Sequence, residues 1–535
     1  MNKLLKYSTR FFALLFVLSG CNDYLKEDSG DLLIPNKVED FANMLYAEGY
    51  PSEFNDDVAW FKLMTDDIEM GQLEIDPYDD DSYKSYDLFD SYEGGEGRQA
   101  YVWSQDIELK IKDNFWANRY ANILACNTVI DALPTMEIEG DSAKFNYLAA
   151  QAYGLRAFNY WCLINSYALP YSSSNLDKPG VIIRTTPQID VSDRARSSIR
   201  EVYALINKDI EKAEQYIKGC SAPDNKHLLS EPAILFLASR IALFQENWTE
   251  VIRSGEEFMK QVSTVFDLNS VDETTFGAEI ASESFYIMNG YVNKEIVFTF
   301  GNNNTYYKYM SDETSGHIYG LGFRPSHQGG NSLLESYEEG DLRRKAYFMQ
   351  DLPQTEEYDW WEDAYITYPG THFYAYPSKY RQAYDPAATK PSDKTKRENW
   401  RSVEVLLNLA EAYVRSTNSV DSRALNLLNT LRRNRFASSA YVEKTAADFS
   451  NADALLKFIW DERRRELCFE EAMRFWDLRR QGMPQIVHKW YNSWETYETY
   501  TLNQGSPNYV LSIPDSETNY NDACVNNNRE IITAQ

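Results

Sequence analysis

The sequence predicts a mainly α-helical fold, built from about four helical pairs with long irregular, partly β insertions between them. Two patterns indicate it. Apolar residues recur at helical spacing in pairs of segments with short connectors, and the stretches between the pairs are rich in Gly, Asn, Tyr and Pro. The chain has 535 residues, 43% of them hydrophobic, and can bury a large core. Repetition of the pairs favours a tetratricopeptide-like stack.

The helical pairs are expected near residues 115–168, 198–262, 403–436 and 453–482. In the first pair, Pro134 ends one helix and Pro170 follows the other, because proline cannot continue a helix. In the second pair, we expect a helix over 198–217 and a partner that starts at 231 and continues into Phe258. Two helices joined by a short connector form a hairpin.

The segments 51–110 and 265–400 are expected to form an irregular lobe. Residues 51–100 hold fifteen Asp and Glu against three Lys and Arg, without helical periodicity. In the second segment, residues 295–300 are a candidate strand. Long irregular segments in a compact protein are usually functional or disordered, and this aromatic content favours a folded, functional lobe. We therefore expect the ligand-binding surface there.

The first twenty residues resemble a lipoprotein signal peptide. Lysines and an arginine precede the apolar run 11–18, which is far too short to span a bilayer. Cys21 follows Ser19 and Gly20, as in a bacterial lipobox, so we expect Cys21 to be lipidated and anchored by several acyl chains. Residues 21–31 read as a polar tether. The lysine and acidic residues of this tether resemble surface-export signals of some outer-membrane lipoproteins.

Charge and motif content exclude several classes of protein. A net charge of −28 makes nucleic acid an improbable partner, because this field repels phosphates. Nucleotide, zincin and serine-hydrolase signatures are absent from the sequence. Five histidines without helical i,i+4 spacing argue against a metal site. The acidic run that contains Asp79, Asp80 and Asp81 is a weak calcium candidate beside its simpler interpretation as a solvated loop.

Cysteine content argues for stabilisation by core packing. Without Cys21, five cysteines remain, an odd number that implies no complete disulfide framework. Three lie in periodic helical segments and are expected to be small buried residues: Cys126, Cys162 and Cys468. Cys220 and Cys524 lie near turns, and the sequence does not decide whether they pair.

A C-terminal segment carries a specific resemblance. Residues 461–470 read Asp-Glu-Arg-Arg-Arg-Glu-Leu-Cys-Phe-Glu, and 474–480 read Arg-Phe-Trp-Asp-Leu-Arg-Arg. This segment is similar to the C-terminal signature of the SusD/RagB family. The segment from Ala149 to Pro170, with its Arg-Ala-aromatic core, resembles another helix of that family. The likeness extends in order from Cys21 to the C-terminus.

This resemblance implies a single SusD-like domain over 32–535, in a lipid-anchored protein of the outer membrane that faces the cell exterior. Such proteins sit as lids on SusC-like, TonB-dependent transporters and capture oligosaccharides, or in some members peptides. The resemblance also implies that the protein is not an enzyme and needs no cofactor. Ligand residues vary in the family, so none is transferred.

The charges of the C-terminal helix permit two interpretations. The spacings Asp461 to Arg465, Glu470 to Arg474 and Glu462 to Arg465 predict ion pairs along a solvated face. Aromatic residues interleave with these charges, which indicates instead that some arginines bind neighbouring elements. In both interpretations the helix is structural.

Carbohydrate receptors use exposed aromatic rings for the apolar faces of sugars and polar side chains for the hydroxyls. Each ring that removes 40 to 50 Å² of apolar area contributes about 1 kcal/mol, so three or four rings predict a dissociation constant of about micromolar to millimolar. The candidate platforms are Trp60, Tyr101, Trp103, Tyr291, Tyr306, Tyr307, Trp360 and Trp361. The candidate polar partners are Asp66, Asn302 and Arg324. For each ring taken alone, core packing is the competing interpretation.

Three alternatives to an oligosaccharide receptor stay open at this stage. The same fold could bind a peptide, because aromatic rings also bind peptides. A lipid-anchored glycosidase would need two carboxylates about 5 to 10 Å apart, and 81 acidic residues offer many pairs. The third and weakest alternative is a protein-interaction scaffold.

Overall fold

The fold is seen in a computed structural model that describes most of the chain. The described residues are 35–51, 54–70, 92–105, 110–138, 140, 142–188, 192–220, 225–271, 293–301, 323–327, 331–350, 356–359, 364–367, 375–377, 379, 397–491 and 496–535. Helices dominate this part of the chain, and the strands described there form two-stranded sheets. The predicted mainly α-helical class is confirmed.

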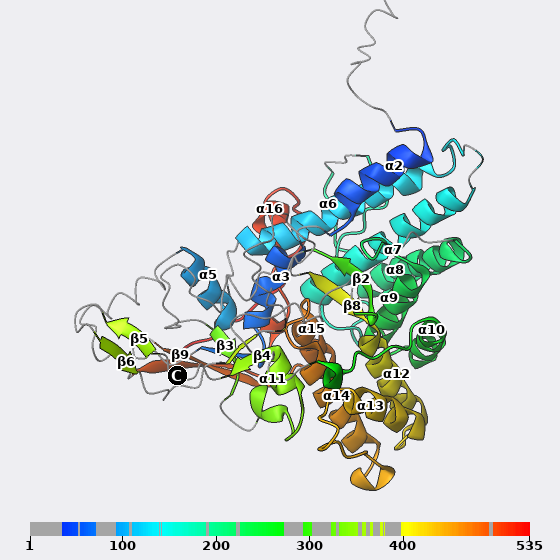
Figure 1. The fold of residues 1–535 in the computed structure, drawn as a ribbon. Coiled ribbons are helices and arrows are strands. Elements are labelled where there is room, and N and C mark those ends of the chain that lie inside the picture. The colour runs from blue at the N-terminus through cyan, green and yellow to red at the C-terminus, as the bar shows by residue number, and fades with distance from the viewer. Residues whose placement is uncertain are drawn as a thin grey trace, which may run out of the picture.

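A stack of packed helices forms the scaffold. Its members are α6 (Lys110–Ala132), α7 (Ser142–Tyr167), α8 (Ile199–Ile217), α9 (Glu231–Phe244), α10 (Trp248–Gln261), α12 (Ser402–Thr417), α13 (Ser422–Arg433), α14 (Ala452–Leu467) and α15 (Met473–Arg480). Neighbours along the chain pack together, and α12 also contacts α10 and α14 (Figure 1). The four predicted pairs fall on these helices.

Side-chain caps fix where several of these helices begin. Ser198 precedes α8 in a capping box, where its backbone N–H donates to a Glu201 carboxylate oxygen at 2.8 Å and its hydroxyl accepts from the Glu201 N–H. Asn451 caps α14 in the same way, accepting from the Ala454 N–H at 2.9 Å. Asn418 adopts a left-handed φ of 49° and ends α12.

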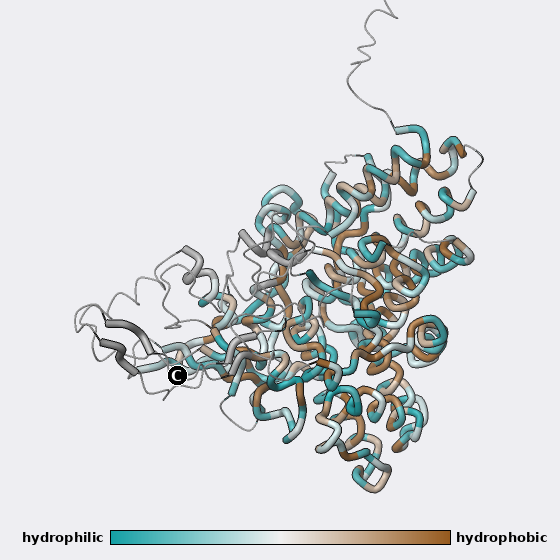
Figure 2. The backbone as a smooth tube through the Cα atoms, in the orientation of Figure 1, coloured by the Kyte–Doolittle hydropathy of each residue, from teal (hydrophilic) through white to brown (hydrophobic). Residues whose placement is uncertain are grey.

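Helix α9 lies at the centre of the stack, and every residue from Ala233 to Phe244 is buried. Figure 2 shows it as a mostly hydrophobic segment among helices with polar outer faces. The expectation of one continuous helix over 231–258 is wrong. Glu246 has a φ of 54° and Asn247 caps a separate helix, α10, so the chain reverses direction. No helix in the described ranges has the length and apolar character to cross a bilayer.

The helical signal predicted over 453–482 is also divided, because α14 and α15 are separate helices. Between α14 and α15, Phe469 and Glu471 adopt positive φ angles of 62° and 45°. Non-glycine residues rarely take this conformation. The turn directs Glu470 and Glu471 into the core, where both are buried.

Short strands build the lobe beside the helical stack. The antiparallel pairs are β1 (Ile68–Met70) with β3 (Phe323–Pro325), β2 (Ile296–Phe300) with β8 (Glu398–Arg401), β4 (Phe348–Gln350) with β7 (Ala375–Pro377), β5 (Glu356–Asp359) with β6 (Ala364–Thr367), and β9 (Ile486–Tyr491) with β10 (Tyr497–Leu502). The strand predicted at 295–300 is confirmed as β2. The β9–β10 hairpin lies outside the segments predicted to form the lobe, and Figure 1 shows β9 extending away from the helices beside β5 and β6.

The segment 51–110 was expected to be irregular, but it is partly helical. It contains helices α3 (Phe54–Leu63) and α5 (Tyr92–Tyr101). Helix α3 packs against α6 and α15, so this part of the expected lobe belongs to the helical core. The acidic residues of this segment had masked the apolar positions Val58, Phe61 and Leu63, all of which are completely buried.

Shorter helices complete the fold. They are α2 (Val38–Met44), the π-helical η1 (Leu45–Gly49), α11 (Arg343–Tyr347), α16 (Asp515–Thr518), and the 3₁₀ turns η3 (Leu268–Ser270), η6 (Leu334–Ser336), η7 (Ala446–Asp448) and η8 (Pro507–Tyr509).

Stacked aromatic rings join the helices to the β2–β8 sheet. Trp400 on β8 is fully buried and stacks on Phe236 of α9, with ring centroids 5.0 Å apart. Phe298 on β2 packs on the same indole at 4.8 Å. Much of the aromatic excess of the sequence therefore serves the core.

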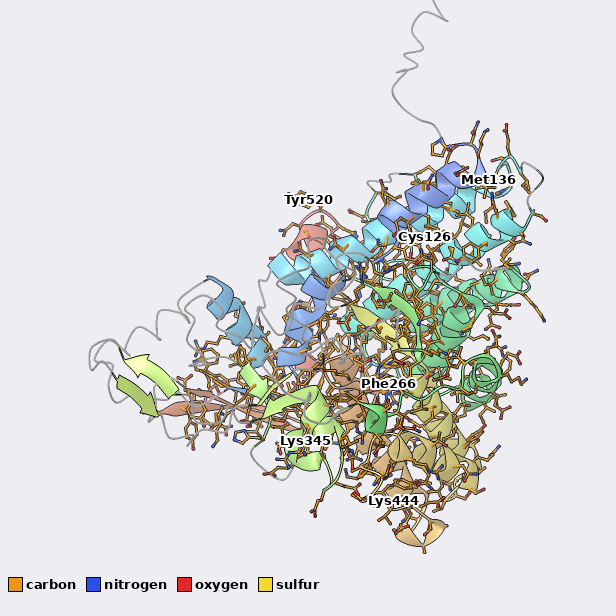
Figure 3. The ribbon with its side chains drawn as sticks, viewed as in Figure 1. Cys126, Met136, Phe266, Lys345, Lys444 and Tyr520 are labelled. Carbon is orange, nitrogen blue, oxygen red and sulfur yellow. The ribbon has the colours of Figure 1, made fainter. Side chains whose placement is uncertain are left out.

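All five cysteines in the described part of the chain are free. Cys126, Cys162 and Cys468 are buried, as predicted, and Figure 3 shows Cys126 within the helical stack. Burial raises the pKa of the Cys126 thiol to about 12, so it stays protonated. Cys220 and Cys524 are not paired with each other.

Candidate functional site

Three of the predicted aromatic platforms are core residues, and Tyr101, which is 1% exposed, is one of them. Trp60 and Trp103 are both 0% exposed. Trp60 stacks on Phe61 with centroids 4.2 Å apart, and the Trp103 indole N–H donates to the Met64 carbonyl at 3.0 Å. Neither ring has a face free for a ligand, so these two candidates are wrong. They pack inward because α3 and α5 fold onto the scaffold.

Some predicted residues come together around a pocket. Asp66 and Tyr101 line a cavity of about 520 Å³, and Arg324 contacts its lining residue Glu69. This volume is within the usual range for small-molecule sites. The lining comes from four segments: β1 together with Asp66, the end of α5, three residues after β3, and β9 together with Gln485. We call this cavity the β1–β9 pocket.

Tyr101 joins the two strands that flank the pocket. Its hydroxyl accepts a hydrogen bond from the Met70 N–H of β1 at 2.9 Å. Burial raises the pKa of this hydroxyl, while the backbone of Met70 and of Lys489 on β9 favours the opposite shift. The hydroxyl thus lies between the backbones of β1 and β9 and contacts both. It holds the base of the pocket together.

We predict that Tyr101→Phe destabilises the protein by about 1–3 kcal/mol, because the buried Met70 N–H loses its acceptor. Urea unfolding, followed by far-UV circular dichroism, measures the change. Tyr497→Phe is the matched control, since Tyr497 is 49% exposed on the neighbouring strand, and it should change stability by less than about 0.5 kcal/mol. Equal effects of both variants would contradict the bridging role.

Asp66 is held rigidly at the pocket wall. Its carboxylate accepts two hydrogen bonds from Arg474, Nε at 2.7 Å and Nη2 at 2.6 Å. Its backbone carbonyl accepts from Arg464 Nη2 and from the Ser326 hydroxyl, both at 2.7 Å. Burial raises the pKa of Asp66, but Arg464 and Arg474 outweigh this effect and hold the pKa well below its usual range. Asp66 is therefore an ionised, oriented acceptor.

Glu69 is neutralised in a similar way. Arg324 Nε donates to its carboxylate at 2.9 Å, and His327 donates from its backbone N–H at 3.0 Å and contacts it through Nδ1. Burial raises the pKa of Glu69, but the His327 hydrogen bond and Arg324 outweigh it and lower the pKa. Arg324, predicted as a partner for ligand hydroxyls, is instead committed mainly to Glu69.

His488 forms the floor of the pocket beside Tyr101. Its imidazole lies between the rings of Tyr101 and Trp103, at centroid distances of 4.1 and 4.2 Å and nearly parallel to both. Nδ1 lies 2.7 Å from the Tyr101 carbonyl and Nε2 lies 3.0 Å from the Thr65 carbonyl. Burial lowers the pKa of His488 to about 4, so the ring is neutral at pH 7 and serves as a rigid structural layer.

The C-terminal signature forms a buried ion-pair network behind the pocket. Glu470 pairs with Lys379 and Arg401 rather than with Arg474, and Asp461 pairs with Lys457 rather than with Arg465. The predicted pair of Glu462 with Arg465 is present, at 2.9 Å, but it is buried. The interpretation that arginines bind neighbouring elements is thus correct, and two of the three local pairs are wrong.

Several predicted site residues lie outside the described residues. They are Cys21, Tyr291, Asn302, Tyr306, Tyr307, Trp360, Trp361 and the calcium candidates Asp79, Asp80 and Asp81. Within the described residues, no group of three or more His, Cys, Asp or Glu side chains is arranged to hold a metal ion.

Sequence reasoning missed the contribution of β9 to the pocket. Burial alternates along β9, with Ile486, His488 and Trp490 inward, but the residue types do not, because Val487 is exposed and His488 is buried. The sequence therefore lacks the alternation of apolar and polar residue types that predicts a half-buried strand.

The scaffold and the pocket define a class: a tetratricopeptide-like helical stack with an irregular lobe that carries a cavity. The SusD family model matches residues 294–529, and a model described as "Starch-binding associating with outer membrane" matches residues 55–243. These two matches, together with the relatives below, support a SusD/RagB family protein.

The chain is similar over its length to named proteins. It is 23% identical to SusD-like protein P2 of Formosa agariphila, over 98% of this chain and 99% of that protein. A SusD-like carbohydrate binding protein from Bacteroides vulgatus has the same fold, with a TM-score of 0.63, 19% identity, and coverage of 93% of this chain and 99% of that one. A laminarin-binding SusD-like protein matches with a TM-score of 0.57 and 18% identity, over 92% of this chain and 98% of the other.

Proposed function

We propose that this protein is a non-catalytic receptor that binds oligosaccharides at the cell surface and passes them to a SusC-like, TonB-dependent transporter in the outer membrane. The observation that carries the proposal is the β1–β9 pocket, in which oriented polar groups adjoin apolar surface. Its lining combines Asp66 and Asn331 with Ile68 and Tyr491. A sugar presents the complementary combination, hydroxyls around an apolar ring face.

The family supports a carbohydrate as ligand and the outer membrane as location. One matching family model is described as starch-binding and associated with the outer membrane, and one structural neighbour binds laminarin. The lipobox-like Cys21 would supply the anchor, and the acidic tether after it favours exposure to the cell exterior. Delivery to a transporter follows from the family resemblance.

The chemistry of the pocket carboxylates argues against a glycosidase. A glycosidase general acid needs a raised pKa, so that it is protonated near neutral pH. Asp66 and Glu69, the acidic residues that line the pocket, both have lowered pKa values, because arginines face Asp66, and a His327 hydrogen bond and Arg324 act on Glu69. Neither is suited to protonate a leaving group.

The test is a calorimetric titration of the purified mature protein with panels of oligosaccharides and peptides. We expect an oligosaccharide to bind with a dissociation constant of about micromolar to millimolar and without release of shorter products. Binding of peptides alone would replace the proposal by the peptide alternative. Release of shorter sugars by the purified protein would overturn the non-catalytic assignment.

A further inference from the structure

The charges that line the β1–β9 pocket are balanced except at one edge. Asp66 is neutralised by Arg474, and Glu69 by Arg324. Asp67, next to Asp66, pairs with Arg464 at 2.6 Å. Each of these three described carboxylates therefore has its own guanidinium. These acidic groups leave no net negative charge in the cavity, although the whole chain carries −28.

Lys489 on β9 is the cation at this edge for which the described part of the chain supplies no carboxylate. It is exposed and lines the pocket, and among the described residues no carboxylate lies within ion-pair distance of its ammonium. Its Nζ lies 4.4 Å from the centre of the Tyr497 ring on β10. Contact with the ring face limits the range of side-chain positions, and the ammonium N–H groups that point away from the ring are available to a ligand.

A buried donor faces the same cavity. Ser332 is 3% exposed and lines the pocket, yet its hydroxyl has no hydrogen-bond partner within the described part of the chain. Buried hydroxyls are almost always hydrogen-bonded, so an unpartnered one in a cavity wall indicates a missing partner. The adjacent Asn331 is exposed and lines the pocket too. Ser332 and Lys489 both offer donors to the cavity.

We infer that the β1–β9 pocket is specific for acidic oligosaccharides, whose carboxylate or sulfate group pairs with Lys489 and accepts a hydrogen bond from Ser332. This inference rests on the proposed function and names its ligand class. The overall negative charge repels acidic polymers at long range, but salt screens this field beyond about 8 Å. Local pairing with Lys489 then decides which sugars bind. The arginine-paired Asp66 accepts from sugar hydroxyls.

The experiment compares tetragalacturonate with its neutral methyl ester, by calorimetric titration of the mature protein in 150 mM salt. A sulfated galactan tetrasaccharide is the third probe and separates sulfate from carboxylate as the preferred anion. We expect one or both acidic probes to bind about tenfold more tightly than the neutral ester, the effect of one charge-assisted hydrogen bond. Lys489→Met should remove this preference, and Ser332→Ala should reduce it.

Lys208→Met is the matched control, because it removes an exposed lysine from α8 and changes the net charge equally. It should leave all affinities unchanged, and thermal unfolding of each variant checks that the fold is intact. If the neutral ester binds as tightly as both acidic probes, or if Lys489→Met keeps the preference, the inference is wrong and the proposed function stands. If none of a wider set of neutral and acidic sugars binds, the proposed function fails with it.

Discussion

Replacing Glu466 by glutamine is expected to destabilise the folded protein by about 3–5 kcal/mol. Glu466 lies on α14 with its side chain fully buried, and three arginines share its carboxylate. The oxygen-to-nitrogen distances are 3.1 Å to Arg343, 2.8 Å to Arg401 and 3.0 Å to Arg435. Burial raises the pKa of Glu466, but these guanidiniums outweigh it and lower the pKa far below its usual range. A neutral amide would leave the buried cations short of one negative charge.

Urea unfolding at pH 7 measures this loss, with Asp461→Asn as the control. Asp461 lies on the same helix and pairs with Lys457 at 2.8 Å, but both side chains are exposed. Exposed pairs contribute little, so the control should cost less than about 0.5 kcal/mol. A cost below about 1 kcal/mol for Glu466→Gln would show that the network is not needed for stability.

This network explains what the sequence could and could not predict about the scaffold. Helical spacing located the four helical pairs, because each helix places an apolar stripe against its neighbour. The same spacing predicted an ion pair between Glu470 and Arg474, although Glu470 pairs with Arg401 and Lys379. The turn at Phe469 and Glu471 ends the helix before those side chains can meet. Local spacing therefore fails where tertiary packing redirects the backbone.

The candidate site was predictable only in part, for a related reason. Asp66 was identified because acidic residues stood in a segment expected to be irregular. Tyr101 was predicted as an exposed platform, but it is 1% exposed and stacks on His488 at the base of the pocket. His488 lies 387 residues beyond Tyr101 in the sequence, and no local pattern connects His488 or Lys489 to Asp66. Trp60 and Trp103 were misassigned because a sequence distinguishes poorly between a buried indole and an exposed one.

A second buried carboxylate should make stability fall as the pH rises from about 5 to 8. Glu471 shares the guanidinium of Arg240 with Glu404, and its backbone N–H donates to the Glu398 carboxylate at 3.0 Å. Burial, together with these two carboxylates, outweighs Arg240 and raises the pKa of Glu471 to about 7. In the unfolded chain the pKa is near 4.5. Between these values the folded protein binds a proton that the unfolded chain has released, so stability decreases with rising pH.

Glu471→Gln should remove this dependence, because an amide stays neutral at every pH. The free energy of unfolding of the variant minus that of wild type should increase by about 2–3 kcal/mol as the pH rises from 5 to 8. Urea unfolding at pH 5, 6.5 and 8 measures both profiles. Glu257→Gln, at an exposed residue that pairs with Lys260, should give a profile parallel to wild type.

His488 acts in the opposite direction, since burial lowers its pKa to about 4 and stability is lost as the pH falls from about 6.5. Both variants retain His488, so its contribution cancels in the difference. Parallel profiles for Glu471→Gln and wild type would show that Glu471 is already ionised at pH 5 in the folded protein.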